Sequence, residues 1–163
     1  MPRQVIQMDT IDFGDIFAFT AVDIFTREAD IFLAPELTAR YGSQFFARSM
    51  ERRFSGLVHL IQTDGGSEFK ADFLKHVHGF CDKHRIARPY RKNEQSYIES
   101  FNRTVRKECL GWSKYRTDQL QECVEMVESF LQRYHYHRPH MGLNMTPPLL
   151  KKKEVDCRIF TEN

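Results

Sequence analysis

Three acidic side chains, Asp9, Asp64 and Glu99, stand where a pair of divalent cations could be held. Asp9 and Asp64 each close a short apolar run that predicts a strand, and Glu99 lies early in a predicted helix. Groups at strand ends line the functional crevice of open α/β sheets. Mg²⁺ prefers carboxylate ligands, and two metal ions about 4 Å apart can activate an attacking oxygen and stabilise a leaving one. The triad therefore predicts phosphodiester chemistry.

Other interpretations of these acids stay open at this point. Taken singly, each of the three is most often a turn, helix-entry or solvent-facing residue. Further acids also compete for the same role: Asp23 lies late in the second predicted strand, Glu68 in the first turn of a helix, and Asp12 and Asp15 in a loop. Composition does not choose between these sets.

The pattern of apolar residues predicts the elements that must position the acids. Residues 5–9, 17–24 and 29–33 are rich in β-branched and aromatic side chains and predict an antiparallel meander. Helical spacing then predicts a helix over 38–54, followed by a buried strand over 57–63 and a helix over 67–80 that Ser67 caps. A brief strand over 86–88 and a loop over 90–96 come next. Two helices over 97–110 and 117–136 follow, and then an irregular, proline-containing tail over 137–148. This order predicts an α/β domain with a mixed sheet.

Composition fits one soluble domain. The chain has 163 residues, of which 41% are hydrophobic and 28% charged. No apolar run reaches the roughly 20 residues of a membrane helix, and the first residues do not form a signal peptide. The four cysteines form no C-x-x-C pair, which argues against a disulfide framework. We expect an intracellular protein.

The charges are unevenly distributed. Residues 83–116 contain ten Lys or Arg against three Glu, so that this stretch carries +7 and the rest of the chain −5. A local basic block in a near-neutral chain suits a polyanion-binding surface. A solvated helix face is the alternative.

The predicted helix around Glu99 places a metal ligand and basic groups together. Glu99, Asn102, Arg103 and Arg106 follow an i, i+3, i+4, i+7 spacing and share one face. Guanidinium groups bind phosphate in a bidentate manner, so this face could clamp a phosphodiester beside the metals. Surface ion pairs are the alternative role of the two arginines. Trp112, after Gly111, could anchor an interface, although a lone Trp usually packs.

Four motifs, in order, resemble a known family. Gln7-Met8-Asp9 resembles the first-aspartate strand of DDE-type integrases and transposases, and Gln62-Thr63-Asp64-Gly65-Gly66-Ser67-Glu68-Phe69 resembles their second-aspartate motif. Pro89-Tyr90, followed by residues 95–103, resembles their loop and glutamate helix. His137-Arg138-Pro139-His140, with Leu143 and Thr146-Pro147, resembles the tail of bacterial insertion-sequence transposases. The resemblance spans nearly the whole chain.

The resemblance implies a ribonuclease-H-like fold, with a five-stranded mixed sheet flanked by helices. It implies that Asp9, Asp64 and Glu99 are catalytic and bind Mg²⁺ or Mn²⁺, with two ions when DNA is bound. It also implies DNA-end hydrolysis and strand transfer, in which a 3′-hydroxyl attacks a target phosphodiester. One departure is the spacing: 34 residues separate Asp64 from Glu99, one fewer than is commonest in the family, which a loop deletion would explain.

Further expectations concern DNA, domains and partners. Besides Asn102, Arg103 and Arg106, we expect DNA contacts from the polar loop residues Arg91, Lys92 and Gln95. Residues 1–136 are interpreted as the catalytic core and 137–163 as its C-terminal extension. By resemblance we expect a homo-oligomer acting on mobile-element ends and target DNA, in the cytoplasm and associated with the nucleoid. A helix-turn-helix region could be missing upstream, which would make the chain a fragment.

Two rival functions remain at this stage. The first is a catalytically inactive DNA-binding or assembly module from a decayed mobile element. The second is a ribonuclease-H-like nuclease that cleaves RNA–DNA hybrids, against which the tail motif argues.

Overall fold

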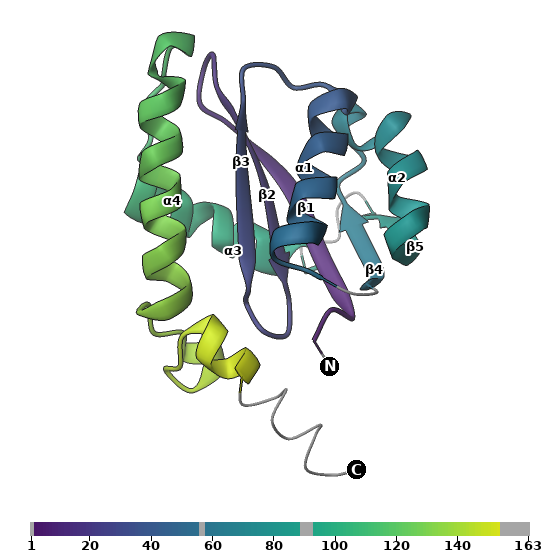
Figure 1. Ribbon diagram of the computed structural model, residues 1–163, viewed down its shortest axis with the longest axis vertical. Coiled ribbons are helices and arrows are strands. Elements are labelled where there is room, and N and C mark those ends of the chain that lie inside the picture. Colours follow the sequence, from purple (N-terminus) through teal and green to yellow (C-terminus); the bar gives the residue numbers. More distant parts are fainter. Residues whose placement is uncertain (1, 56–57, 89–92, 154–163) are drawn as a thin grey trace.

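A five-stranded mixed sheet forms the centre of the molecule, as the computed structural model shows for residues 2–55, 58–88 and 93–153 (Figure 1). The strand order is β3-β2-β1-β4-β5. The strands are β1 (Val5–Asp12), β2 (Phe17–Asp23), β3 (Ala29–Ala34), β4 (Val58–Thr63) and β5 (Cys81–Ile86). The helices are α1 (Ala39–Arg52), α2 (Asp72–Phe80), α3 (Ser96–Val105) and α4 (Leu120–Tyr136).

The first three strands pair as the predicted antiparallel meander, and β4 and β5 then run parallel to β1. Parallel neighbours need crossover connections, which α1 and α2 provide. The fifth strand was predicted at 86–88, but β5 occupies Cys81–Ile86. That prediction is wrong because β5 is an edge strand of mostly exposed polar residues, which carries no apolar pattern.

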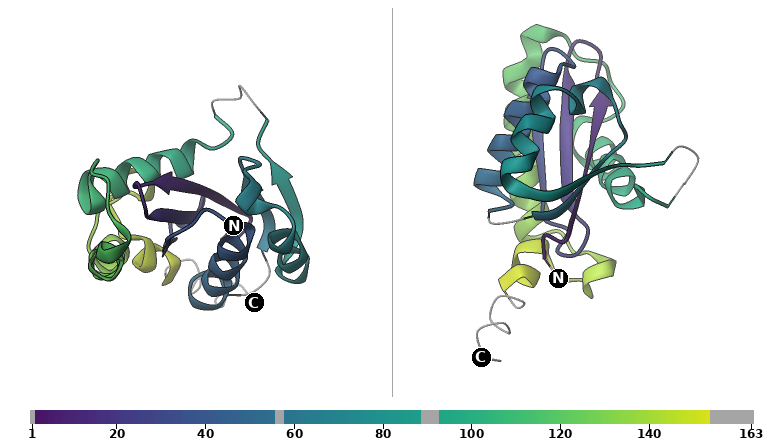
Figure 2. Two further views of the ribbon diagram at one scale, coloured as in Figure 1. Left: turned by 90° about the horizontal axis from the view of Figure 1, so that it is seen from above. Right: turned by 90° about the vertical axis from the view of Figure 1, so that its right-hand side faces the viewer.

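Helices cover both faces of the sheet, with α1 and α2 on one side and α3 and α4 on the other (Figure 2). Successive side chains of a strand point to opposite faces of the sheet, so each strand contributes to the core of both layers. Ile6 and Met8 of β1 pack in the α1/α2 layer, whereas Ile11 packs in the α3/α4 layer. Gln7 and Asp9 alternate with Ile6 and Met8, so their side chains lie on the same face of the sheet as Ile11, the face that α3 covers.

Several predicted boundaries need correction. The first strand does not end at Asp9, because β1 continues to Asp12. Ser67 does not cap α2 but opens a separate 3-10 turn, Ser67–Phe69, and α2 begins at Asp72. The helix predicted over 97–110 is α3 followed by a π-helical turn, Arg106–Leu110.

Residues 137–153 fold back toward the end of the sheet at which β1 begins (Figure 1). It contains a 3-10 turn, Met141–Leu143, and residues 148–153 are helical rather than irregular. Pro148 stands at the first helical position, where a missing N–H does no harm. Among the described helices, none has the length and apolar character needed to cross a membrane.

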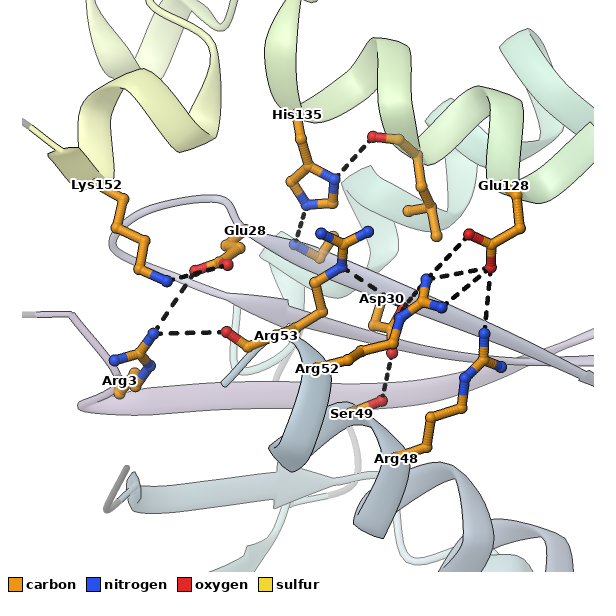
Figure 3. A network of polar contacts seen from close by, with 12 residues as sticks. Arg3, Glu28, Asp30, Arg48, Ser49, Arg52, Arg53, Glu128, His135 and Lys152 are labelled. Atoms are coloured by element: carbon orange, nitrogen blue, oxygen red, sulfur yellow. Dashed lines mark hydrogen bonds and ion pairs between the residues drawn. The ribbon is translucent and has the colours of Figure 1, made fainter. Parts of the chain in front are cut away.

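An ion-pair network joins α1, β3 and α4 (Figure 3). It lies at the β3 edge of the sheet, and β5 forms the opposite edge. Asp30 of β3 is fully buried, and its carboxylate accepts hydrogen bonds from Ser49 Oγ (2.8 Å) and Arg52 Nε (3.1 Å). Arg52 also pairs with Glu128 of α4 at 3.1 Å, and Arg48 does so at 3.2 Å. The carboxylates here all have permanent basic partners.

Candidate active site

Asp9 lies in the middle of β1, directly opposite Thr20 of β2. Its carboxylate accepts a hydrogen bond from the side-chain amide of Asn102 on α3 (2.8 Å). The amide oxygen of Asn102 accepts in turn from the hydroxyl of Thr20 (2.8 Å). A neutral amide, held from both ends, therefore orients Asp9 without neutralising it.

The charges that shift the pKa of Asp9 most are those of other carboxylates. Burial, the largest cause, raises the pKa of Asp9 from 3.8 to about 6, although a hydrogen bond from the Thr10 backbone lowers it. Three neighbouring carboxylates also raise this pKa: Asp64, Glu68 and Glu99. Like charges gathered in one place favour protonation or the binding of a cation.

Asp64 follows β4, and a two-glycine turn shapes the chain around it. Continuing the β1–β4 register by two residues places Asp64 level with Asp9. Its carboxylate accepts a hydrogen bond from the backbone N–H of Gly66 (2.9 Å). Gly65 has a φ of +86°, and a Cβ on Gly66 would lie 2.5 Å from the carboxylate of Glu68. The positive φ favours glycine at position 65, and a side chain at position 66 would force the Glu68 carboxylate to move.

Glu68 is a fourth carboxylate in this region, one of the acids that the sequence left in competition. Its side chain is buried, and Thr10 Oγ1 donates a hydrogen bond to it (3.1 Å). Within the described part of the chain, no basic group pairs with it. Glu68 thus adds negative charge beside Asp9 from the side of β4.

The start of α3, and with it Glu99, is held by a residue that sequence reasoning missed. Gln7 lies two residues before Asp9 on the same face of β1 and is 3% exposed. Its amide nitrogen donates to the carbonyl of Glu94 (2.7 Å), and its amide oxygen accepts from the N–H of Ile98 (3.0 Å). Gln7 therefore satisfies a free N–H in the first turn of α3 and ties that turn to the strand of Asp9. A polar residue at a core-facing strand position was the available signal.

Ion pairs of Glu94 also fix the segment just before α3. The Glu94 carboxylate pairs with Arg85 (2.9 Å) and Arg88 (2.6 Å), and hydrogen bonds from Arg88 hold the pKa of Glu94 well below its usual range. Two arginines of the basic block are therefore engaged within the molecule. Lys114 and Arg116 are engaged in the same way, with Asp12 and Asp118.

Asp9 and Glu99 open into one cleft of about 420 Å³. Asn102, Arg103 and Arg106 line it as well, which confirms that the four residues of α3 and its continuation share one face. The opposite face enters the core, as expected, through Ile98, Phe101, Val105 and Leu110. A carboxylate and two guanidinium groups thus line the same cleft.

Asp64 does not line this cleft, although it is close enough to act on the pKa of Asp9. Among residues 2–55, 58–88 and 93–153, no three acidic, His or Cys side chains are grouped closely enough to hold one metal ion. None of Asp9, Asp64 and Glu99 forms an ion pair with a described residue. The donors are carboxylate oxygens without competing cations, which fits a hard divalent ion.

The expected DNA-binding residues differ in their surroundings. Arg103 is exposed, and its guanidinium has no hydrogen-bond partner among the described residues. Arg106 donates to the carbonyl of Asp12 (3.2 Å). Gln95 is partly buried, and its amide nitrogen lacks a partner in the described ranges. Arg91 and Lys92 lie outside the described residues. Asn102 is occupied by Asp9 and Thr20, so its first contact is with the acid.

The sequence is similar to the integrase core domain and to proteins of insertion elements. Residues 81–148 match the family of the integrase core domain. A protein of insertion element IS407 from Burkholderia multivorans is 32% identical over 148 residues, covering 86% of this chain and 50% of that protein. A protein of insertion element IS476 from Xanthomonas euvesicatoria is 28% identical over 155 residues, covering 91% and 44%. The chain thus spans about half the length of these relatives.

Solved structures resemble the chain over almost all of its length. The catalytic core domain of BIV integrase superposes with a TM-score of 0.74 at 15% identity, covering 97% of this chain and 99% of that one. The HTLV-2 integrase catalytic core domain, solved in complex with magnesium in a trimeric form, gives 0.70 at 14% identity, covering 92% and 96%. These likenesses confirm the expected ribonuclease-H-like fold.

Proposed function

Because this chain is an integrase core domain of the DDE integrase and transposase type, we propose that it is the catalytic core of a DNA transposase. Its reactions are metal-dependent phosphodiester hydrolysis at DNA ends and DNA strand transfer. One observation carries the proposal: Asp9 is partly buried among three other carboxylates and, within the described residues, has no basic partner. An uncompensated acid cluster costs free energy unless it binds a cation.

In this proposal Asp9, Asp64 and Glu99 hold Mg²⁺ or Mn²⁺, two ions when DNA is present. The metal pair supplies activation of the attacking oxygen and stabilisation of the leaving oxygen. Asn102 keeps the carboxylate of Asp9 turned into the cleft, and Gln7 keeps Glu99 beside it. Metal binding requires the three acids to draw closer together, because in this structure they are not grouped closely enough to hold one ion.

DNA is held, in this proposal, by the basic side chains around the acids. Arg103 has a free guanidinium at the cleft, and it would bind the phosphodiester next to the reacting one. Arg106 lines the same wall. Arg91, Lys92, Gln95 and Asn102 complete the proposed contact surface. Fixing the phosphate between these groups and the acids supplies the in-line geometry that the transfer needs.

The wider setting of the reaction is also a proposal. We infer a homo-oligomer on paired element ends, bound to the nucleoid, with end recognition supplied by a helix-turn-helix region upstream of residue 1. A chain of the simian T-cell lymphotropic virus intasome has a similar fold, with a TM-score of 0.73 at 14% identity. Residues 137–163 are proposed as an extension of the catalytic core.

The test joins metal binding to strand transfer. Mn²⁺ binding is measured by calorimetry, and joining of a labelled 3′-hydroxyl DNA end to plasmid is measured with Mg²⁺ or Mn²⁺. Asp64→Asn should weaken Mn²⁺ binding and abolish joining. Asp12→Asn is the matched control, since Asp12 lines the same cleft but pairs with Lys114 at 2.9 Å.

Two outcomes would replace the proposal. DNA binding by wild type without metal-dependent nicking or joining would identify an inactive DNA-binding or assembly module. Metal-dependent cleavage of RNA–DNA hybrids in place of DNA joining would identify a ribonuclease.

A further inference from the structure

Trp112 is a large aromatic side chain that the proposed chemistry leaves without a role. It is 68% exposed, although it lines the cleft that Asp9 and Glu99 share. Gly111, immediately before it, has a φ of +71°, a conformation that favours glycine and turns the chain out of the π-helical turn. Trp112 therefore lies outside the core, and its described ring contact is with Arg106.

A stack of side chains supports the indole from below. The guanidinium carbon of Arg106 lies 4.8 Å from the ring of Trp112 and 4.8 Å from the ring of Phe13. Phe13 is fully buried, and Arg106 also donates to the Asp12 carbonyl (3.2 Å). The core ring, the guanidinium and the indole thus form a column that rises from the core to the cleft. Because the indole is mostly exposed while Arg106 covers one face, its other face is open.

The surroundings of Trp112 distinguish between two kinds of ligand. A protein-interface anchor normally sits within an apolar patch that excludes water. Among the described residues lining this cleft, Trp112 is the single exposed large apolar side chain, and the others are polar, charged or, for Ile11, buried. A nucleobase fits such a site better, because it offers a flat apolar face at the end of a charged backbone.

We propose that the open face of Trp112 stacks on an unpaired nucleobase of the DNA strand whose phosphodiester lies at the acids. This proposal rests on the proposed function and adds to it a base-binding subsite. An indole backed by a guanidinium presents a stacking surface to any base, so the subsite selects unpaired over paired DNA rather than one sequence.

Trp112 is the one tryptophan in the sequence, so its emission reports this contact directly. Fluorescence and anisotropy are measured in EDTA, where no reaction occurs, with three DNAs: a duplex with a two-base unpaired 3′ end, the same duplex with abasic sites at those two positions, and a blunt duplex. Binding of the unpaired end should quench the emission strongly, and binding of the abasic end should not.

Variants separate stacking from structure. Trp112→Ala should weaken binding of the unpaired-base DNA about tenfold and leave abasic DNA binding unchanged, whereas Trp112→Phe should retain most of the preference. Tyr97→Ala is the matched control, because Tyr97 is an exposed aromatic that also packs against an arginine, Arg27 at 4.0 Å, but lines a different cavity. It should keep the full preference.

Failure of this proposal is distinct from failure of the proposed function. Normal DNA binding by anisotropy with unchanged emission, or an equal effect of Trp112→Ala on all three DNAs, would overturn the stacking role alone. A change of oligomeric state in Trp112→Ala, with DNA binding unaltered, would make Trp112 a contact between copies instead. Quenching by unpaired bases without metal-dependent joining would support stacking and contradict the transposase assignment.

Discussion

Two groups of carboxylates beside the same sheet differ in whether they have basic partners: the β3 group, Asp30 and Glu128, and the β1 group, which comprises Asp9, Asp64, Glu68 and Glu99. On β3, Asp30 is fully buried against Arg52 and Ser49, and Arg52 bridges onward to Glu128 (Figure 3). On β1, Asp9 receives only neutral donors from side chains and otherwise faces acids. Arginines within the molecule neutralise the acids of the β3 group, whereas we expect a bound cation to neutralise those of the β1 group.

The difference shows how burial alone fails to identify a functional acid. Both groups contain buried or partly buried carboxylates, and each lies between a strand and a helix. What separates them is the source of compensating charge. In the β3 group that charge comes from arginines of α1, and it ties α1 to the sheet. In the β1 group no described base forms an ion pair with Asp9, Asp64 or Glu99, so a bound cation would relieve the repulsion between the carboxylates.

Removing one acid from each group should give the largest contrast. Asp9→Asn removes a metal ligand and should lower DNA joining by about a thousandfold or more, since several kcal/mol of transition-state stabilisation are lost. Its folding stability should stay the same or rise, because a like-charge cluster is relieved. The rate of joining and urea denaturation in EDTA measure the two quantities. A strongly destabilised Asp9→Asn would show that the β1 acids serve the fold.

Asp30→Ala should have the opposite effect. It leaves Arg52 and Ser49 without their buried partner and should lower the free energy of unfolding by about 3 kcal/mol. Glu128→Gln, on a half-exposed partner of the same arginine, should cost less than about 1 kcal/mol. Joining activity per folded molecule should be unchanged in both variants. If Asp30→Ala lost activity while remaining folded, the division between the two groups would be false.

The pH dependence of stability should also separate the groups. The pKa of Asp9 is raised in the folded chain from 3.8 to about 6, so its contribution to stability is present below pH 4 and is lost as the pH rises to about 6. The loss should be about 3 kcal/mol in EDTA, and Mn²⁺ should reverse it. Subtracting the Asp9→Asn profile from wild type isolates this residue. Parallel profiles would contradict the raised pKa.

A more modest effect on joining is expected from the hydrogen bonds by which Gln7 connects β1 to α3. Gln7→Ala removes two hydrogen bonds, to the Glu94 carbonyl and from the Ile98 N–H, and should cost about 1–2 kcal/mol of stability. Glu99 would then be less well held, so joining should fall more than Mn²⁺ affinity does. Gln4→Ala, an exposed glutamine just before β1, is a suitable comparison. Equal effects of both changes on joining would remove Gln7 from the site.

Much of this arrangement could be predicted from the sequence, and the exceptions have physical reasons. The meander, the strand before Asp64 and the shared face of Glu99 and Arg103 follow from local periodicity. The strand β5 was misplaced because an exposed edge strand needs no apolar residues.

Tertiary contacts account for the remaining differences. The helix spacing places Asn102 beside Glu99, but only the pairing of Asp9 with Thr20 across two strands shows which group its amide meets. The role of Gln7 depends in the same way on a contact 91 residues away. The exposure of Trp112 could not be read from its neighbours in sequence, because it depends on the turn at Gly111.

A crystal soaked in Mn²⁺, with data collected at the manganese absorption edge, tests the central claim most directly. Anomalous density is expected among Asp9, Asp64 and Glu99, with the carboxylate of Asp64 drawn into the cleft, and none at Asp30 or Glu128. Absence of density at the three acids at saturating Mn²⁺, or density confined to other acids, would contradict the assignment of this cleft as the catalytic site.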